Sequence, residues 1–166
     1  MISKPPSLGS QSPEEWIKEF LGYFETLRFE FMRAKALWFP AQSNDVHGNH
    51  PGEQLTAGTS AYISFIVPRE IGEVKEAVIR FIPTTSGTID WTATISYAAK
   101  NEDEAAATAT KTADGLAVTD DRMTEIDITS VFAAIEADDQ VGVKITLDAV
   151  ATTTNIYVLG LYFKYR

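Results

Sequence analysis

The chain has 166 residues, 45% of them hydrophobic, and it contains no cysteine. This composition suits one folded domain with an appendage, and it excludes disulfides, thiolate metal sites and a cysteine nucleophile. The net charge of −9 lies entirely in residues 41–166, which contain nine basic and eighteen acidic residues. Because an acidic surface repels phosphate backbones and anionic lipids, we expect no nucleic-acid partner and no membrane partner.

The first residues predict an arm followed by a helix. Residues 1–11 are rich in Pro, Gly and Ser, which is typical of a flexible N-terminal arm that either frays or orders against a partner. In Ser12-Pro13-Glu14-Glu15, Ser12 can cap a helix and Glu15 completes a capping box. We predict one amphipathic helix over residues 12–38, ended by the proline at position 40. No stretch reaches the roughly 20 apolar residues of a membrane span, and residues 1–11 lack the apolar run of a signal peptide.

An apolar stripe runs along this predicted helix with alternating steps of three and four residues, as in a heptad seam. Such a stripe either packs on the β-domain of its own chain or bundles with copies of itself, and we favour the bundle. Trp16, Leu21 and Tyr23 widen the stripe beyond a dimer seam, which favours three or more helices. The predicted oligomer interface consists of Ile17, Phe20, Phe24, Leu27 and Phe31, and Ala34 extends the stripe.

Residues 39–60 are polar and rich in Gly, Asn and Pro, and they predict a linker into a β-domain over residues 61–166. Turn signals separate the strand patterns of this domain, without the long helices that a parallel sheet requires. The expected fold class is mainly β: an antiparallel β-sandwich, jelly-roll-like rather than immunoglobulin-like, preceded by one long N-terminal helix. The expected strands are 62–67, 77–82, 88–97, a hairpin in 105–118 that turns at Asp114-Gly115, 125–129, 141–147 and 155–165, with a brief helix at 130–137.

The last expected strand is apolar on both faces. Strict alternation puts Ile156, Val158, Gly160 and Tyr162 on one face. Because only one row can face the core, the other needs cover, either from the brief helix or from a neighbouring subunit. The row predicted as core or oligomer interface consists of Tyr157, Leu159, Leu161, Phe163 and Tyr165.

Few residues suggest chemistry. His47 and His50, with Asp45 and Glu53 nearby, could form a metal site, but a Gly/Pro-rich loop cannot fix their geometry and we favour an exposed polar loop. The acidic runs at 102–104, 120–121 and 138–139 lack calcium-loop spacing, so we favour solvated turns. No nucleophile elbow, phosphate loop or dinucleotide fingerprint occurs. We therefore predict no catalytic residue, no metal site and no cofactor.

Aromatic residues offer a third kind of site. Trp38, Trp91 and the tyrosines Tyr157, Tyr162 and Tyr165 could stack on sugar rings, although aromatic side chains are also ordinary core residues of a sandwich. Trp91 lies on the inward row of its strand pattern, which favours the core for that residue.

Several segments of the β-domain resemble small virion domains of tailed phages. They are Thr59–Pro68, Ala77–Pro83, Gly87-Thr88, Thr124–Ile126, Asp138–Val143 and Val158–Tyr165, so that the resemblance covers residues 55–166. It implies a jelly-roll head of the kind found in capsid decoration proteins, head fibres, tail fibres and receptor-binding modules, which are commonly homotrimers. It implies no catalytic residue.

We therefore expect a non-enzymatic structural protein of a phage virion, a decoration protein or a fibre or attachment component that assembles as a homo-oligomer. Its expected partners are copies of itself, favoured as a homotrimer, and other virion proteins held by the arm and the helix. A host surface glycan is a further candidate partner. The first alternative is a carbohydrate- or receptor-binding β-sandwich module. The second is a β-sandwich hydrolase, which would need two carboxylates facing each other across a cleft.

Overall fold

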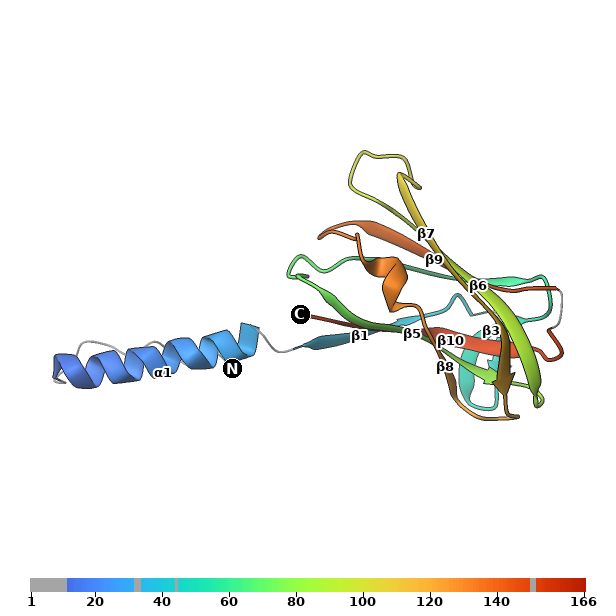
Figure 1. The fold of residues 1–166 in the computed structure, drawn as a ribbon, viewed down its shortest axis with the longest axis horizontal. Helices are drawn as coiled ribbons and strands as arrows, with labels where there is room; N and C mark the ends of the chain where they lie inside the picture. The colour runs from blue at the N-terminus through green and yellow to red at the C-terminus, as the bar shows by residue number, and fades with distance from the viewer. Residues whose placement is uncertain (1–11, 32–33, 44, 150–151) are drawn as a thin grey trace.

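The computed structural model describes residues 12–31, 34–43, 45–149 and 152–166, with the helix side chains described as far as Phe24. These ranges form helix α1 (Pro13–Phe31), a short 3-10 helix η1 (Thr129–Phe132) and strands in two layers, with α1 extending from one end of the layers (Figure 1). The strands are β1 (Lys35–Pro40), β2 (Asp45–His47), β3 (His50–Leu55), β4 (Ser60–Ile66), β5 (Val74–Pro83), β6 (Gly87–Ala98), β7 (Ala107–Val118), β8 (Thr124–Asp127), β9 (Gln140–Leu147) and β10 (Ile156–Tyr165).

The two layers are antiparallel sheets with jelly-roll connectivity. One sheet has the order β2-β3-β10-β5-β8, with β1 also paired to β10, and the other has the order β4-β9-β6-β7. From β3 to β10 the chain changes sheet at every connection except the one between β6 and β7. That order is the jelly roll of two Greek keys. The predicted fold class, a mainly β antiparallel sandwich behind one N-terminal helix, is confirmed.

Helix α1 begins at the predicted capping box. The Glu15 N–H donates to Ser12 Oγ at 3.3 Å, and the Ser12 N–H donates to Glu15 Oε2 at 3.2 Å. These bonds satisfy two donors that the helix itself leaves unpaired. Neither α1 nor any other described helix has the length and apolar character needed to span a bilayer.

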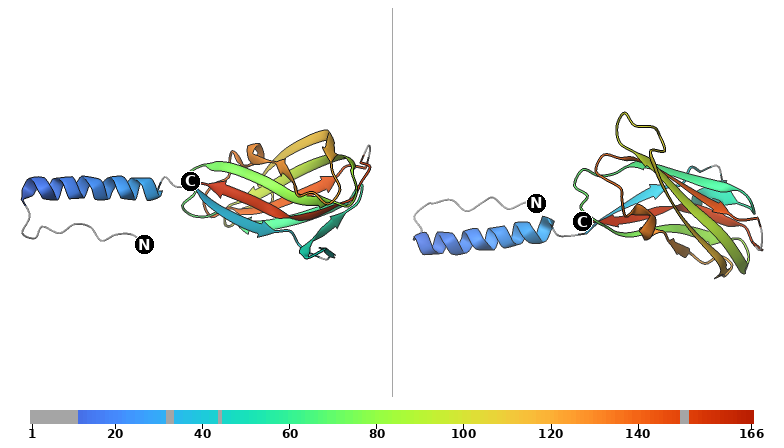
Figure 2. Two further views of the ribbon diagram at one scale, coloured as in Figure 1. Left: turned by 90° about the horizontal axis from the view of Figure 1, so that it is seen from below. Right: turned by 45° about the horizontal axis from the view of Figure 1, so that its top comes forward.

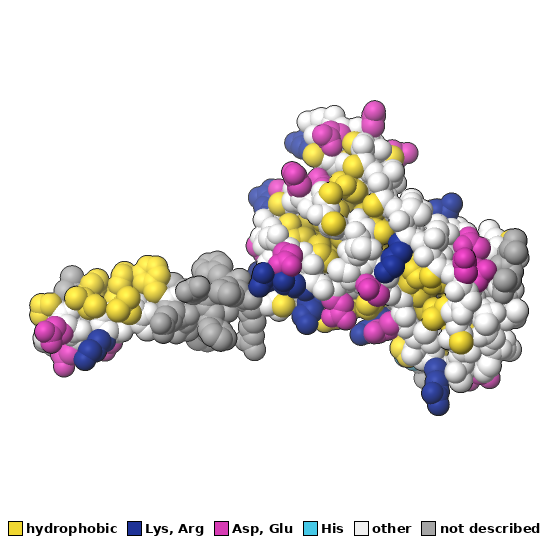
Figure 3. Space-filling view, viewed as in Figure 1, with side chains coloured by type: hydrophobic (Ala, Val, Ile, Leu, Met, Phe, Trp, Pro, Cys, Tyr) yellow, Lys and Arg dark blue, Asp and Glu magenta, His cyan; other side chains and the backbone are white. Residues whose placement is uncertain are grey.

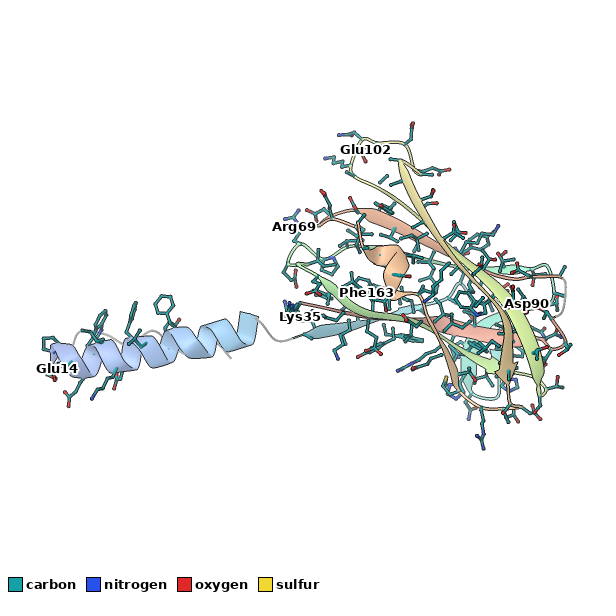
Figure 4. The ribbon with its side chains drawn as sticks, in the orientation of Figure 1. Glu14, Lys35, Arg69, Asp90, Glu102 and Phe163 are labelled. Carbon is teal, nitrogen blue, oxygen red and sulfur yellow. The ribbon has the colours of Figure 1, made fainter. Side chains whose placement is uncertain are left out.

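The core lies between the sheets because side chains alternate along each strand. Trp91, Ala93 and Ile95 of β6 are buried, as predicted from the alternation in this strand. Nearer to α1, an aromatic cluster joins both sheets, and Phe163 lies between them (Figure 4). Each fully buried aliphatic or phenyl side chain contributes roughly 1.5–3 kcal/mol of transfer free energy. Alternate residues of β9, and of β4 together with the residue that follows it, are also buried: Ile63, Phe65, Val67, Val141, Val143, Ile145 and Leu147.

The predicted helix end and linker are wrong. The helix ends at Phe31, and residues 35–40 form strand β1, which pairs along β10 from Tyr165 to Gly160. The apolar run around Trp38 belongs to this edge strand: Leu37 and Phe39 pack on the core, and the Phe39 ring stacks on Phe65 at 4.1 Å between centroids. Residues 45–55 then form the hairpin of β2 and β3. An edge strand tolerates Pro40 because one side of it needs no hydrogen-bond donors.

The predicted turn at Asp114-Gly115 is also wrong, since β7 continues through it as one strand. Ile89 pairs with Leu116 and Trp91 with Ala113, so β7 carries one extra residue. Gly115 has φ 69°, and its N–H donates to Asp90 Oδ1 at 2.6 Å. An Asp-Gly pair can form either a hairpin turn or a bulge of this kind, because both require a left-handed glycine. The brief helix predicted at 130–137 is shorter in the structure, where only the 3-10 helix η1 (Thr129–Phe132) is present in this segment.

A bulge in β10 changes the face of its side chains. Val158 pairs with Phe81 and Gly160 pairs with Arg80, which leaves Leu159 as an extra residue. Beyond the bulge the inward positions shift by one, and Leu161, Phe163 and Tyr165 join the core together with Ile156 and Val158. The prediction of one continuous row from Tyr157 to Tyr165 is therefore wrong, because strict alternation cannot anticipate a bulge.

We predict that Gly160→Ala destabilises the sandwich by about 2 kcal/mol or more. Gly160 has φ 157°, and an added Cβ would contact the Phe39 carbonyl oxygen and lie 2.9 Å from Pro40 Cα. The matched control is Gly142→Ala in β9, where the nearest atom to an added Cβ is 4.0 Å away. We expect the control to stay within about 0.5 kcal/mol of the parent in urea unfolding. Equal stability of the two variants would contradict the assigned bulge.

Candidate functional site

The apolar stripe of α1 is exposed in the single chain. Ile17, Leu21 and Phe24 are 51%, 59% and 52% exposed. Trp16 stacks on Phe20, and Phe20 contacts Phe24 edge-on, each at 4.7 Å between ring centroids. Hydrophobic side chains gather along one side of the helix and charged ones along the other (Figure 3). Further views show that the helix lies clear of the sandwich (Figure 2). Leu27 and Phe31, also predicted as interface residues, have side chains outside the described part of the structure.

The outer faces of the two sheets differ in chemistry. The outward positions of the β4-β9-β6-β7 sheet form a grid of hydroxyl groups, such as Thr92 opposite Thr112 and Thr94 opposite Thr110. These groups satisfy one another: Thr94 and Thr110 lie 3.3 Å apart, and Ser60 and Thr146 lie 2.8 Å apart. The other sheet differs, because its outer face combines aromatic rings with an ion pair.

The outer face of the β10 sheet carries an aromatic and charged cluster formed by Trp38, Tyr162, Arg80 and Glu125, which we call the Trp38 cluster. The Arg80 guanidinium carbon lies 4.9 Å from the Tyr162 ring centroid and 5.9 Å from that of Trp38. Arg80 Nε donates to Glu125 Oε1 at 2.8 Å. Trp38 is 44% exposed, whereas Trp91 is buried in the core as predicted. Sequence reasoning missed Arg80, although a lone charge in the apolar run 77–83 was the available signal.

The bulge in β10 makes room for this cluster. An added Cβ on Gly160 would lie 2.8 Å from Trp38 Cζ2, so the indole packs where a side chain is missing. Leu159 turns to the outer face beside it. Together they line a groove of about 320 Å³, whose other lining residues are Pro40, His50, Pro51, Arg80 and Met123.

The hairpin of β2 and β3 borders this groove, and its histidines have separate roles. His47 Nε2 lies 2.8 Å from Asp121 Oδ1, and its ring lies 4.7 Å from that of Tyr157. Loss of water around the Tyr157 hydroxyl, with the nearby Asp45 carboxylate, raises the pKa of Tyr157. His50 instead lines the groove. Among the described residues no three metal-ligand side chains converge, here or elsewhere.

The acidic runs are engaged in local structure. Arg69 Nε donates to both carboxylate oxygens of Asp138 at 3.0 Å. Asp139 accepts the Glu136 N–H at 2.8 Å, and Glu102 accepts the Ala99 N–H at 3.0 Å. These carboxylates stabilise turns at the sandwich edges, where Asp138 also adopts a left-handed backbone with φ 67°.

The five predicted last-strand residues fall into two groups. Leu161, Phe163 and Tyr165 belong to the core, and the Tyr165 hydroxyl donates to Glu70 Oε1 at 3.3 Å. Tyr157 and Leu159 lie on the outer face, beside His47 and in the groove, respectively. Their predicted role as an oligomer interface stays a prediction.

Comparison with known proteins gives only structural likenesses. No family model and no curated protein matches the sequence. A family two carbohydrate esterase from Cellvibrio japonicus is similar at 8% identity and a TM-score of 0.42, over 81% of this chain and 34% of the esterase. Carbohydrate-binding module CBM36 in complex with calcium and xylotriose is similar at 15% identity and a TM-score of 0.42, over 78% of this chain and 98% of the module. A chain in the structure of infectious bursal disease virus, Gx strain, is similar at 17% identity and a TM-score of 0.46, over 80% of this chain and 32% of the viral chain.

This chain thus spans about a third of the esterase and of the viral protein. At TM-scores this low, the likenesses carry no argument about the function of this chain. Its jelly-roll fold follows from its own strand order.

Proposed function

We propose that this chain is a non-catalytic structural or attachment subunit of a phage-type virion, which assembles through α1 and displays the sandwich as a head. The observation that carries the proposal is the apolar stripe of α1, which is half-exposed in the single chain. A helix of this kind gains stability mainly when its apolar face is buried against a partner.

The breadth of the stripe favours three helices over two. Ile17, Phe20 and Phe24 follow a heptad seam, and Leu21 adds a fourth large apolar side chain beside them. A two-helix seam buries only the a and d positions, whereas a three-helix bundle also covers the flanking positions.

The joint between helix and head supports this arrangement. Strand β1, the next described element after α1, pairs with β10 and packs Phe39 on the core, so each head holds the strand that follows the helix. Lys35 at the start of β1 also donates to Glu70 at 2.8 Å, and this ion pair lowers the pKa of Glu70. The helix extends from one end of the sandwich, which leaves the opposite end and both outer faces available for contacts (Figure 2).

We predict that the full chain sediments at about three times the monomer mass at micromolar concentration, and that Phe20→Glu with Phe24→Glu converts it to a monomer. The two added carboxylates would be buried without partners in the bundle, which is strongly unfavourable. The matched control is Lys18→Glu, which changes the net charge by the same amount outside the stripe and should leave the mass unchanged. A monomeric parent protein would contradict the proposal.

A second function, carbohydrate recognition by the head, is favoured by the Trp38 cluster. An exposed indole beside a groove offers the flat apolar surface that a sugar ring can stack on, and the Arg80–Glu125 pair adds a donor and an acceptor for hydroxyl groups. This function is compatible with the first, because an attachment head can bind a host surface glycan.

We predict that the assembled protein binds at least one glycan class on a glycan array. The stacking surface and the paired charges of the Trp38 cluster would supply the contacts. Heat-denatured protein provides the background control. An array without any signal above that background would contradict carbohydrate recognition and leave the assembly proposal unaffected.

A further inference from the structure

The Trp38 cluster combines the groups needed to bind a polyhydroxylated ring. Arg80 donates to Glu125 through Nε, and its guanidinium carries two further nitrogens that can donate. Glu125 accepts this bond at Oε1, and its carboxylate has a second oxygen that can accept. The side chains of Arg80 and Glu125 are 37% and 45% exposed, so both can reach a ligand. A partly exposed donor group thus lies beside a partly exposed acceptor, next to an exposed indole.

Charge indicates which sugars fit. Arg80 is the one strong cation that lines the described groove, and Glu125 already neutralises it. Residues 41–166 as a whole are acidic, with nine basic against eighteen acidic residues. A polyanionic glycan would therefore meet a net negative domain, and the described groove lining holds no strong cation besides the paired Arg80 to offset that charge. A neutral glycan would meet no such penalty, and its hydroxyl groups can donate to Glu125 and accept from Arg80.

The size of the groove agrees with a small ligand. Its volume of about 320 Å³ lies at the lower end of the range for small-molecule sites, roughly 300–1,000 Å³. The groove has apolar walls formed by Leu159, Pro40 and Pro51. Apolar walls of this kind suit the C–H face of a sugar ring.

We propose that this groove binds a neutral pyranose oligosaccharide, with one sugar ring stacked on Trp38 and its hydroxyl groups bridging Arg80 and Glu125. The proposal rests on the carbohydrate-recognition function above and adds the location of the site and the class of sugar. Trp38 supplies stacking, whereas Arg80 and Glu125 fix the orientation of the ring.

The test is calorimetric titration of the full chain with neutral oligosaccharides (xylo-, cello-, manno- and malto-series) and with acidic ones (oligogalacturonate and sialylated glycans). We expect binding in a neutral series and none in the acidic set. Trp38→Ala should weaken binding about tenfold or more, and Arg80→Gln by a similar factor. The matched control is Tyr62→Ala, which removes a half-exposed aromatic ring from the other sheet and should leave affinity unchanged. Thermal unfolding and sedimentation of every variant check its fold and its oligomeric state.

The outcomes separate this proposal from the function on which it rests. Binding of acidic glycans alone would overturn the neutral class and keep carbohydrate recognition. Neutral binding that survives Trp38→Ala in a folded variant would overturn the location. A change of oligomeric mass in Trp38→Ala would mark this face as a subunit contact and would also overturn the proposal. Absence of binding to every glycan would overturn the carbohydrate-recognition function itself.

Discussion

The rest of this structure depends on the bulge at Leu159-Gly160 in β10. The extra residue changes which side chains of β10 face the core, so Ile156 and Val158 on one side of the bulge and Phe163 on the other all point inward. It also lies where β1 ends and β3 begins along the same edge of β10, because Pro40 pairs with Gly160 and Glu53 with Val158. The missing side chain at Gly160 then leaves space for the Trp38 indole.

The bulge lies between the helix proposed for assembly and the groove proposed for recognition. Strand β1 joins the helix to the sheet through Phe39 on its inner face, and it presents Trp38 on its outer face. Side chains that alternate along one short strand thus stabilise the joint and form part of the candidate binding groove. The other outer face, a grid of mutually bonded hydroxyl groups such as Thr94 and Thr110, offers no comparable combination of an exposed indole and paired charges.

Much of the fold could be predicted from the sequence, because period-two alternation in β4, β6 and β9 and the Ser12–Glu15 capping box are local signals. The errors came where two structures share one local signal. The run around Trp38 fits a helix end as well as an edge strand, and only pairing with β10 decides between them. Asp114-Gly115 fits a turn as well as a bulge. The register change in β10 depends on contacts between residues far apart in the sequence, because the backbone atoms of Phe39 and Pro40 lie against Gly160. For the same reason the candidate site could not be predicted, although Trp38 was an evident aromatic candidate.

We propose that the bulge creates a recognition face around Trp38. The most direct measurement is a nuclear magnetic resonance titration of isotope-labelled full-length protein with the neutral oligosaccharide that binds best. We expect the largest chemical-shift changes at the Trp38 indole N–H, the Arg80 Nε–H and the backbone amides of Gly160 and Tyr162. Shifts that gather instead on the hydroxyl grid of β6 and β7, with the Trp38 indole unchanged, would contradict it.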